Sequence, residues 1–491
     1  MNNLYLSQRS FLRIMYHIRF VIKLAFLLHL LRLGGINAQT SISLSQAVDS
    51  LALYCPAAKL RQLDYESQLL QRRNYNLGFL PSLAFTLSPI NFNHSLRLLQ
   101  VPDDGSYRYI EDYSNNTSIG LTLKQKIRFT GGELSLSSTL GILSELSLKR
   151  TSFSSTPFSI GYSQQLWGAR HLYQLERRIE NLRTQVIKKQ YQVDLFKIQL
   201  EVVRIYMEAI QNYLELEQSR LLHSRNDSLQ AIAALKLKQG QITQYDYNQI
   251  ELQTLGQYQA IEVAHHAYER TLTRLKAYLG IDNVKSIVLP KMNFPIFLDL
   301  AQVQADIDLN NPFATEQEIE LILSDQAFYQ VKLGTYLNGN INLSYGINQH
   351  AYRFSDAYRS GNVRQAVILG LQVPIFQWGI NKNKLRIARN TYEANRIKAA
   401  IRVKELENEV STLVDRYNHA TKRWYTAHRS YTLAQCQYEI LIEKFRLGKI
   451  SLYELIMGER ELQNALKTYY SAMQETVISY YTLRVLTLLD Y

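Results

Sequence analysis

The chain has 491 residues, of which 46% are hydrophobic and 20% charged, and its formal net charge is +13. This composition is that of a folded protein and excludes an intrinsically disordered chain. The basic residues are spread along predicted helices among Glu, Gln and Asn, which favours a solvated helix surface over a nucleic-acid-binding patch. The two cysteines, Cys55 and Cys436, lie far apart in helix-like sequence, so the sequence predicts neither a disulfide framework nor a zinc site.

The first 38 residues are predicted to be a secretory signal peptide. Basic residues precede an apolar run at 24–31, and Ala38 offers a small residue at the cleavage position. A membrane anchor is the alternative, but the run is much shorter than the roughly 20 apolar residues that a spanning helix needs. Met15 is an alternative start that would give a signal of more usual length.

After this segment the chain repeats itself. The matching positions are Pro56 with Pro312, Gly78 with Gly334, Trp167-Gly168 with Trp378-Gly379, and Gly240 with Gly448. The first two pairs are 256 residues apart, the third 211 and the fourth 208. Because their order and spacing agree, we infer a duplication. The fall in spacing means that the first repeat carries about 45 extra residues between Gly78 and Trp167.

Each repeat is predicted to run as helix, strands, very long helix, tight turn and long helix. In chain order we expect a signal peptide at 1–38, a first-repeat N-terminal helix at 39–80, first-repeat β segments with an extra hairpin at 81–166, a first long helical hairpin at 167–280, an inter-repeat linker at 281–310, a second-repeat N-terminal helix at 311–338, a β-hairpin at 339–375 and a second long helical hairpin at 376–491.

The strand predictions rest on alternation of apolar and polar residues, as in 341–348 and 119–124. Strands are expected near 81–90, 117–129, 156–166, 339–349 and 363–374, with a supplementary hairpin after the Thr130-Gly131-Gly132 turn and a loop that holds Tyr107, Tyr109 and Tyr113. A half-buried soluble sheet and a membrane barrel give the same alternation. The strand pattern alone therefore leaves both open.

The long helices are the more decisive feature. Residues 168–240 and 379–448 contain no proline, and at 1.5 Å per residue each would extend about 100 Å. Leu195, Ile198 and Val202 begin an apolar seam that continues by steps of three and four, which is typical of coiled-coil-like packing. The remaining faces are polar, and bulk water and a water-filled duct are equally consistent with them.

These parts together resemble the TolC-like outer-membrane efflux/secretion channel family (outer membrane factor). Asn311-Pro312 resembles the start of a family repeat, although the first copy has Cys55 before Pro56. The segment from Val373-Pro374 to Gly379 resembles the strand-to-helix junction, and Trp167-Gly168 is its counterpart. Segments 240–246 and 448–454 resemble the periplasmic tips of the family.

The resemblance implies a mainly α fold with β: duplicated αββα repeats, long coiled-coil-like helices that form a periplasmic α-barrel, and strands of a transmembrane β-barrel shared by a homotrimer. It implies an outer-membrane exit duct of a Gram-negative bacterium with a periplasmic extension, which works passively in tripartite efflux or type I secretion. The implied partners are outer-membrane lipid, a periplasmic adaptor (membrane fusion) protein and an inner-membrane pump of the RND or ABC type. No cofactor, nucleic acid or catalytic activity is implied.

The resemblance also assigns candidate sites. The adaptor-contact tips are expected at Lys238, Gln239, Gly240, Gln241, Arg446, Leu447, Gly448 and Lys449. Asp246 and Glu454, each six residues after a tip glycine, are candidates for a carboxylate ring at the pore mouth. They are equally explained as acids favoured at helix N-termini. The gate arginine of the enteric channel is replaced by Ile450 here.

The sequence contains no catalytic constellation or metal-binding motif. His265 and His266 are adjacent and therefore point in different directions on a helix. The alternative to a channel is a non-channel periplasmic coiled-coil adaptor or structural protein. An adaptor should show one helical hairpin inserted in a β-rich module, whereas this sequence predicts two equivalent hairpins.

Overall fold

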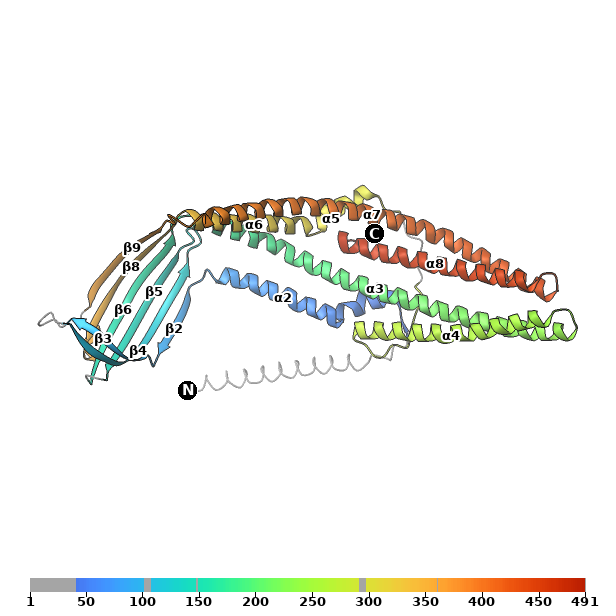
Figure 1. The fold of residues 1–491 in the computed structure, drawn as a ribbon, viewed down its shortest axis with the longest axis horizontal. Coiled ribbons are helices and arrows are strands. Elements are labelled where there is room, and N and C mark those ends of the chain that lie inside the picture. The colour runs from blue at the N-terminus through green and yellow to red at the C-terminus, as the bar shows by residue number, and fades with distance from the viewer. Residues whose placement is uncertain (1–40, 101–106, 147–148, 291–296, 360, 491) are drawn as a thin grey trace, which may run out of the picture. The chain divides into compact units, whose positions relative to one another are not determined.

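The computed structural model describes residues 41–490 except 101–106, 147–148, 291–296 and 360, and Figure 1 labels its helices and strands. The predicted signal peptide lies outside the described residues. The chain divides into two compact units. The first, called the helical unit, comprises described residues up to 61 with 193–305 and 410–490, and the second, called the sheet unit, comprises 62–192 and 306–409. Each unit draws on both sequence repeats, so the repeats are not separate compact bodies.

The sheet unit contains one antiparallel sheet (Figure 1). Its strands are β2 (Ser82–Ser88), β3 (Phe92–Gln100), β4 (Tyr107–Lys126), β5 (Glu133–Glu145), β6 (Arg150–Gln165), β8 (Asn338–Ala351) and β9 (Asn362–Gln372). Neighbours follow the order β2-β4-β5-β6-β8-β9, and β3 pairs with β4 beyond the end of β2. The sheet therefore joins strands of the first repeat directly to the β8–β9 hairpin of the second repeat.

One face of this sheet is apolar and the other carries small polar residues. Phe85 lies opposite Leu121, and Ile160 lies opposite Tyr345. On the other face the aligned residues are mainly Ser, Thr, Gly and Asn: Ser82, Thr86, Gly120, Thr122, Ser135, Ser137, Ser159, Gly161, Asn342 and Ser344. The apolar face is open, with 65% of Phe85 exposed. An open apolar face of this kind marks an interaction surface rather than a closed soluble core.

The expected loop around Tyr107, Tyr109 and Tyr113 was wrong, because all three residues lie in β4. Strand β3, which we did not predict, forms the other side of this extension and pairs Leu98 with Tyr109. Charged residues interrupt the alternation between 91 and 115, so its period is hard to see. Aromatic residues nevertheless favour strands, since they pack well across a pleated surface.

Two glycines with left-handed backbone begin the long helices that follow the strands. Gly168 has φ +81° and Gly379 has φ +82°, which glycine adopts without a steric penalty. Trp167 packs directly over Gly339 at the start of β8, where a Cβ atom would overlap the indole ring. The duplicated Trp-Gly sequence thus places a left-handed glycine before each long helix, although Trp378 also has a positive φ of +51°.

The helices extend as the repeats predicted. They are α2 (Pro56–Leu77), α3 (Ala169–Lys238), α4 (Gln244–Leu279), α5 (Leu300–Asn310), α6 (Phe313–Tyr336), α7 (Ile380–Arg446) and α8 (Leu452–Thr487). A π-helix (Gln46–Leu51) and a 3-10 turn (Ala52–Tyr54) precede α2, and a second 3-10 turn (Phe354–Tyr358) lies between β8 and β9. Pro56 is the first residue of α2, and Pro312 caps α6. No helix among these described segments is long and apolar enough to cross a bilayer.

The core of the helical unit lies along the predicted seam. Ile198, Val202, Ile205 and Ala209 are all buried in one cluster, to which α4, α7 and α8 also contribute residues. The expected linker at 281–310 is more structured than predicted, since it holds α5 and the two-residue strand β7 (Ser286–Ile287). Strand β7 pairs in parallel with β1 (Ser41–Ile42), and two residues are too few to show alternation in a sequence.

Candidate functional site: the hairpin tips

The two helical hairpins of the helical unit end in matching turns. Gly240 has φ +66° and Gly448 has φ +69°. In each turn the glycine N–H donates to the carbonyl three residues back, and the next N–H donates to the carbonyl five residues back, with N–O distances of 2.9 to 3.0 Å. These bonds satisfy carbonyls left free at the helix end, and they require the left-handed backbone that glycine supplies. The predicted tip glycines therefore have a defined structural role.

Asp246 and Glu454 complete a capping box at the start of the returning helix in each hairpin. The Asp246 N–H donates to the Thr243 hydroxyl at 3.2 Å, and the Thr243 N–H donates to the Asp246 carboxylate at 3.0 Å. Ser451 and Glu454 repeat the pair at 3.3 and 3.2 Å. The hydrogen bonds from Thr243 lower the pKa of Asp246, so this carboxylate is held in its ionised form. Within one chain, both acids act as helix caps.

The eight residues predicted as adaptor contacts are all exposed at these turns: Lys238, Gln239, Gly240, Gln241, Arg446, Leu447, Gly448 and Lys449. Arg446 forms an ion pair of 2.9 Å with Glu443 on its own helix. Leu447 is 67% exposed, although it is a large apolar side chain. The two turns therefore present cationic and amide groups around an exposed leucine.

Lys236, which the sequence analysis did not select, joins the two tips. Its ammonium group donates to the carbonyl of Phe445 at 3.2 Å and lies 5.2 Å from the centre of the Phe445 ring. The contact links the last turn of α3 to the last turn of α7, where a cation is favoured by the helix dipole. In the sequence, Lys236 is marked only by its position two residues before Lys238, the first of the expected adaptor-contact residues.

A second link between the hairpins is centred on Glu459 of α8, which is only 4% exposed. Gln253 and Gln257 of α4 donate to its carboxylate, and Gln463 donates from its own helix. Burial raises its pKa to about 7, and the hydrogen bond from Gln253 and the charge of Arg225 oppose this shift. We missed this group, but the spacing of Leu455, Glu459 and Leu462 places an acid within an apolar seam.

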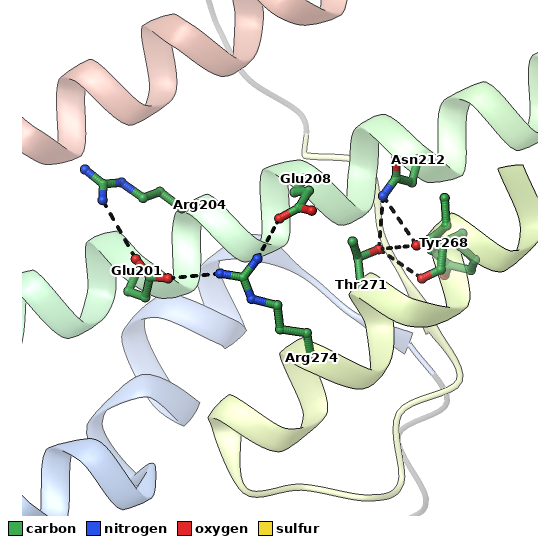
Figure 2. Close-up of polar contacts among 8 residues, drawn as sticks. Glu201, Arg204, Glu208, Asn212, Tyr268, Thr271 and Arg274 are labelled. Atoms are coloured by element: carbon green, nitrogen blue, oxygen red, sulfur yellow. Dashed lines mark hydrogen bonds and ion pairs between the residues drawn. The ribbon is translucent and has the colours of Figure 1, made fainter.

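Polar bonds also join the two helices of the first hairpin, away from its tip (Figure 2). Arg274 of α4 bridges two acids of α3, at 3.0 Å from Glu208 and 3.4 Å from Glu201. Nearby, the amide of Asn212 donates to the Thr271 hydroxyl at 3.3 Å. These bonds lie beside the apolar seam and fix the register of α3 against α4. They are structural contacts within the hairpin.

The described residues contain no group of three or more side chains suited to hold a metal ion. His265 and His266 have ring centroids 6.1 Å apart and no third ligand among these residues. The geometry of the tips is that of two exposed turns, each followed by a helix cap.

Comparison with solved structures defines the class of fold. The chain matches the outer membrane channel CmeC of Campylobacter jejuni with a TM-score of 0.65 and 15% identity, over 90% of this chain and 85% of that one. The outer membrane protein VceC of Vibrio cholerae matches with a TM-score of 0.61 and 11% identity, over 91% and 95%. The MtrE channel of Neisseria gonorrhoeae, in its open state, matches with a TM-score of 0.60 and 14% identity, over 90% and 88%. At these identities the matches define the fold, which is that of outer-membrane channels.

A family model adds a sequence match. Residues 324–487 match the model described as outer membrane efflux protein, while no curated protein matches the chain. Residues 324–487 are therefore similar in sequence to outer membrane efflux proteins, and the chain shares the fold of outer-membrane channels.

Proposed function

We propose that this chain is a passive exit duct, not an enzyme, and that three copies form a channel through the outer membrane and the periplasm. The observation that carries the proposal is the seven-stranded sheet with one open apolar face and one polar face. In lipid, every backbone polar group needs a partner within the protein, so a sheet with free edges must close on further strands. The apolar face then contacts lipid, and the polar face lines water.

In this proposal the duct serves tripartite efflux or type I secretion. Its partners are a periplasmic adaptor and an inner-membrane pump of the RND or ABC type. The pump supplies energy and selects the cargo, because the described polar face of the sheet is built mainly from small uncharged residues, with few charged ones such as Lys124 and Glu133. Small molecules, metal ions and proteins are all cargo classes that such a duct could pass.

Three measurements test the channel itself. We expect the chain in the outer-membrane fraction, a trimer in detergent, and discrete ion-conducting steps when the trimer is added to planar bilayers. A soluble monomer without conductance would refute the proposal.

We further propose that the exposed tip residues, with Gly240 and Gly448 at their centres, contact the adaptor. Gly448→Val introduces a β-branched residue at φ +69°, which distorts the turn. We expect export to be lost while trimers still reach the outer membrane. Gly256→Val is the matched control, because a side chain at Gly256 in α4 would meet nothing within 4 Å. Normal export by the Gly448→Val variant would remove the tips from the adaptor interface.

Asp246 and Glu454 are proposed to have a second role at the pore mouth of the trimer. Three copies would bring six carboxylates together, and their charge would favour cations. The double change Asp246→Asn and Glu454→Gln keeps an oxygen that can accept the capping bonds while it removes the charge. We expect reduced cation preference in planar bilayers and weaker block by multivalent cations. If selectivity and block stay unchanged, these acids serve as helix caps alone.

A further inference from the structure

The first repeat holds more strands than the second, and the excess can be assigned to particular residues. Strand β8 begins at Asn338, 256 residues after β2 begins at Ser82, which is the offset of the paired prolines and of Gly78 with Gly334. Strand β6 ends at Gln165, two residues before Trp167, and β9 ends at Gln372, six residues before Trp378, so each is the last strand before the Trp-Gly junction of its repeat. Strands β2 and β6 thus correspond to β8 and β9, and β4 and β5, within residues 107–145, are the insertion.

Strand β3 does not add a further position across the sheet. Strand β2 pairs with Ser118–Lys124 of β4, and β3 pairs with Tyr107–Asn115 of the same strand. The N–H of Asn116 donates to the carbonyl of Asn91 at 3.0 Å between the two paired stretches. Strands β2 and β3 therefore form one interrupted edge strand, and the array across the sheet has six positions.

The inserted strands lie inside the array rather than beside it. Strand β5 pairs with β4 over residues 133–145 and with β6 over the same residues. Its apolar residues continue the apolar face, with Leu136 between Leu123 and Ile160. On the polar face, Lys124 forms an ion pair of 3.2 Å with Glu133 across the β4–β5 turn. Over residues 133–137, both faces of β5 thus match those of its neighbours.

The two edges of the array fit a second copy of the same chain. Strand β2 leaves α2 and β9 returns toward α7, so β9 of one copy and β2 of the next run antiparallel, as all neighbours in this sheet do. Both edges carry large exposed apolar side chains, among them Phe85 and Val367. Six strands are too few to close on themselves, since membrane barrels need at least about eight.

We propose that β4 and β5 are wall strands, so that three copies of this chain close an eighteen-stranded barrel, whereas two strands from each repeat would close only twelve. This inference rests on the proposed trimeric channel. With strands about 4.8 Å apart and tilted about 40°, eighteen strands form a ring about 36 Å across between backbones, against about 24 Å for twelve. The cross-section is about twice as large. The wider ring suits bulky or hydrated cargo rather than a tight small-molecule pore.

The direct experiment is to count strands in a cryo-electron microscopy map of the full-length trimer in lipid nanodiscs. We expect eighteen wall strands, with β2 of each protomer beside β9 of its neighbour. A conducting trimer with twelve wall strands, and with β4 and β5 folded into the lumen or the periplasm, would overturn this inference and leave the proposed function standing. Absence of a trimer or of conductance would instead refute the proposed function.

Cysteine accessibility gives an independent measurement in membranes, in a background in which Cys55 and Cys436 are replaced by Ala. We expect Ser137→Cys to react with a membrane-impermeant thiol reagent and Leu136→Cys to be at least tenfold slower, because neighbouring wall residues face water and lipid in turn. Ala366→Cys and Val367→Cys of β9 form the matched control pair. If the β9 pair differs tenfold and the β5 pair reacts at one rate, β5 does not lie in the wall.

Discussion

Glu459 gives the sharpest test of how the two hairpins are held together, because its charge is removed from water. The side chain lies on α8 and is 4% exposed, with Gln253 and Gln257 of α4 on its carboxylate. Tyr438 of α7 and Arg225 of α3 are the charged or titratable groups that act on it from the other helices. Opening the contact between the hairpins would return the carboxylate to water.

Burial raises the pKa of Glu459 from its ordinary 4.5 to about 7. A carboxyl group whose pKa is raised in the folded state binds its proton more tightly there. Protonated Glu459 therefore stabilises the closed contact fully below pH 4.5, and this stabilisation is lost as the pH rises through 7. The full difference is about 3 kcal/mol, at 1.36 kcal/mol per pKa unit. Between pH 5 and pH 8 the closed contact should lose most of this benefit, about 2–3 kcal/mol, which shifts its opening equilibrium by about one to two orders of magnitude.

Hydrogen–deuterium exchange of the detergent-solubilised trimer can measure this change. After correction for intrinsic exchange rates, we expect amides of 452–466 to lose protection as the pH rises from 5 to 8. Glu459→Gln should abolish this pH dependence, because the amide side chain does not titrate in this range. The contact itself should persist, since the amide oxygen can still accept the bond from Gln253. Glu461→Gln, on the exposed side of the same helix, is the matched control. Equal pH dependence in wild type and Glu459→Gln would refute the reasoning.

Three further outcomes follow from the local geometry. Thr243→Ala and Ser451→Ala should each reduce the stability of the first turn of a returning helix by about 1 kcal/mol. Amide exchange should become faster in that first turn only, and unchanged exchange would mean that these caps do not stabilise the turns. Gly448→Ala should destabilise its turn by about 1–2 kcal/mol, because its φ is +69°, and exchange at the second tip alone should report it. Gly339→Ala should displace Trp167, since a Cβ there would overlap its ring, and a tryptophan emission spectrum identical to wild type would contradict this packing.

Much of the fold was predictable because the duplication provides an internal comparison. The buried seam at Ile198, Val202 and Ile205 was visible as steps of three and four, and the structure confirms it. The extra first-repeat strands were expected from the change in repeat spacing together with the Thr130-Gly131-Gly132 turn. Sequence periodicity predicts such features well because it reflects which face of an element is buried.

The features that escaped prediction depend on contacts between distant segments. The pairing of Ser41–Ile42 with Ser286–Ile287 involves two residues on each side, which leaves no period to detect. The bond from Lys236 to Phe445 joins positions 209 residues apart. At Glu459 the sequence did contain a signal, an acid at a seam position, but its partners on α4 could be found only from the structure.

The two repeats remain alike at the tips and differ in the sheet, and physical constraints account for both. Each tip needs a left-handed residue followed by a capping box, so Gly240 and Gly448 make the same bonds. The sheet tolerates an insertion only if the chain returns to the end at which α3 must begin, and strands added in pairs meet this condition. The β4–β5 pair meets it, because its turn lies beside the start of α3, where a Cβ atom at Gly131 would come 3.3 Å from the Ala169 carbonyl oxygen. In the proposed trimeric barrel, the number of wall strands can therefore change in one repeat while the turns at the tips stay alike in both.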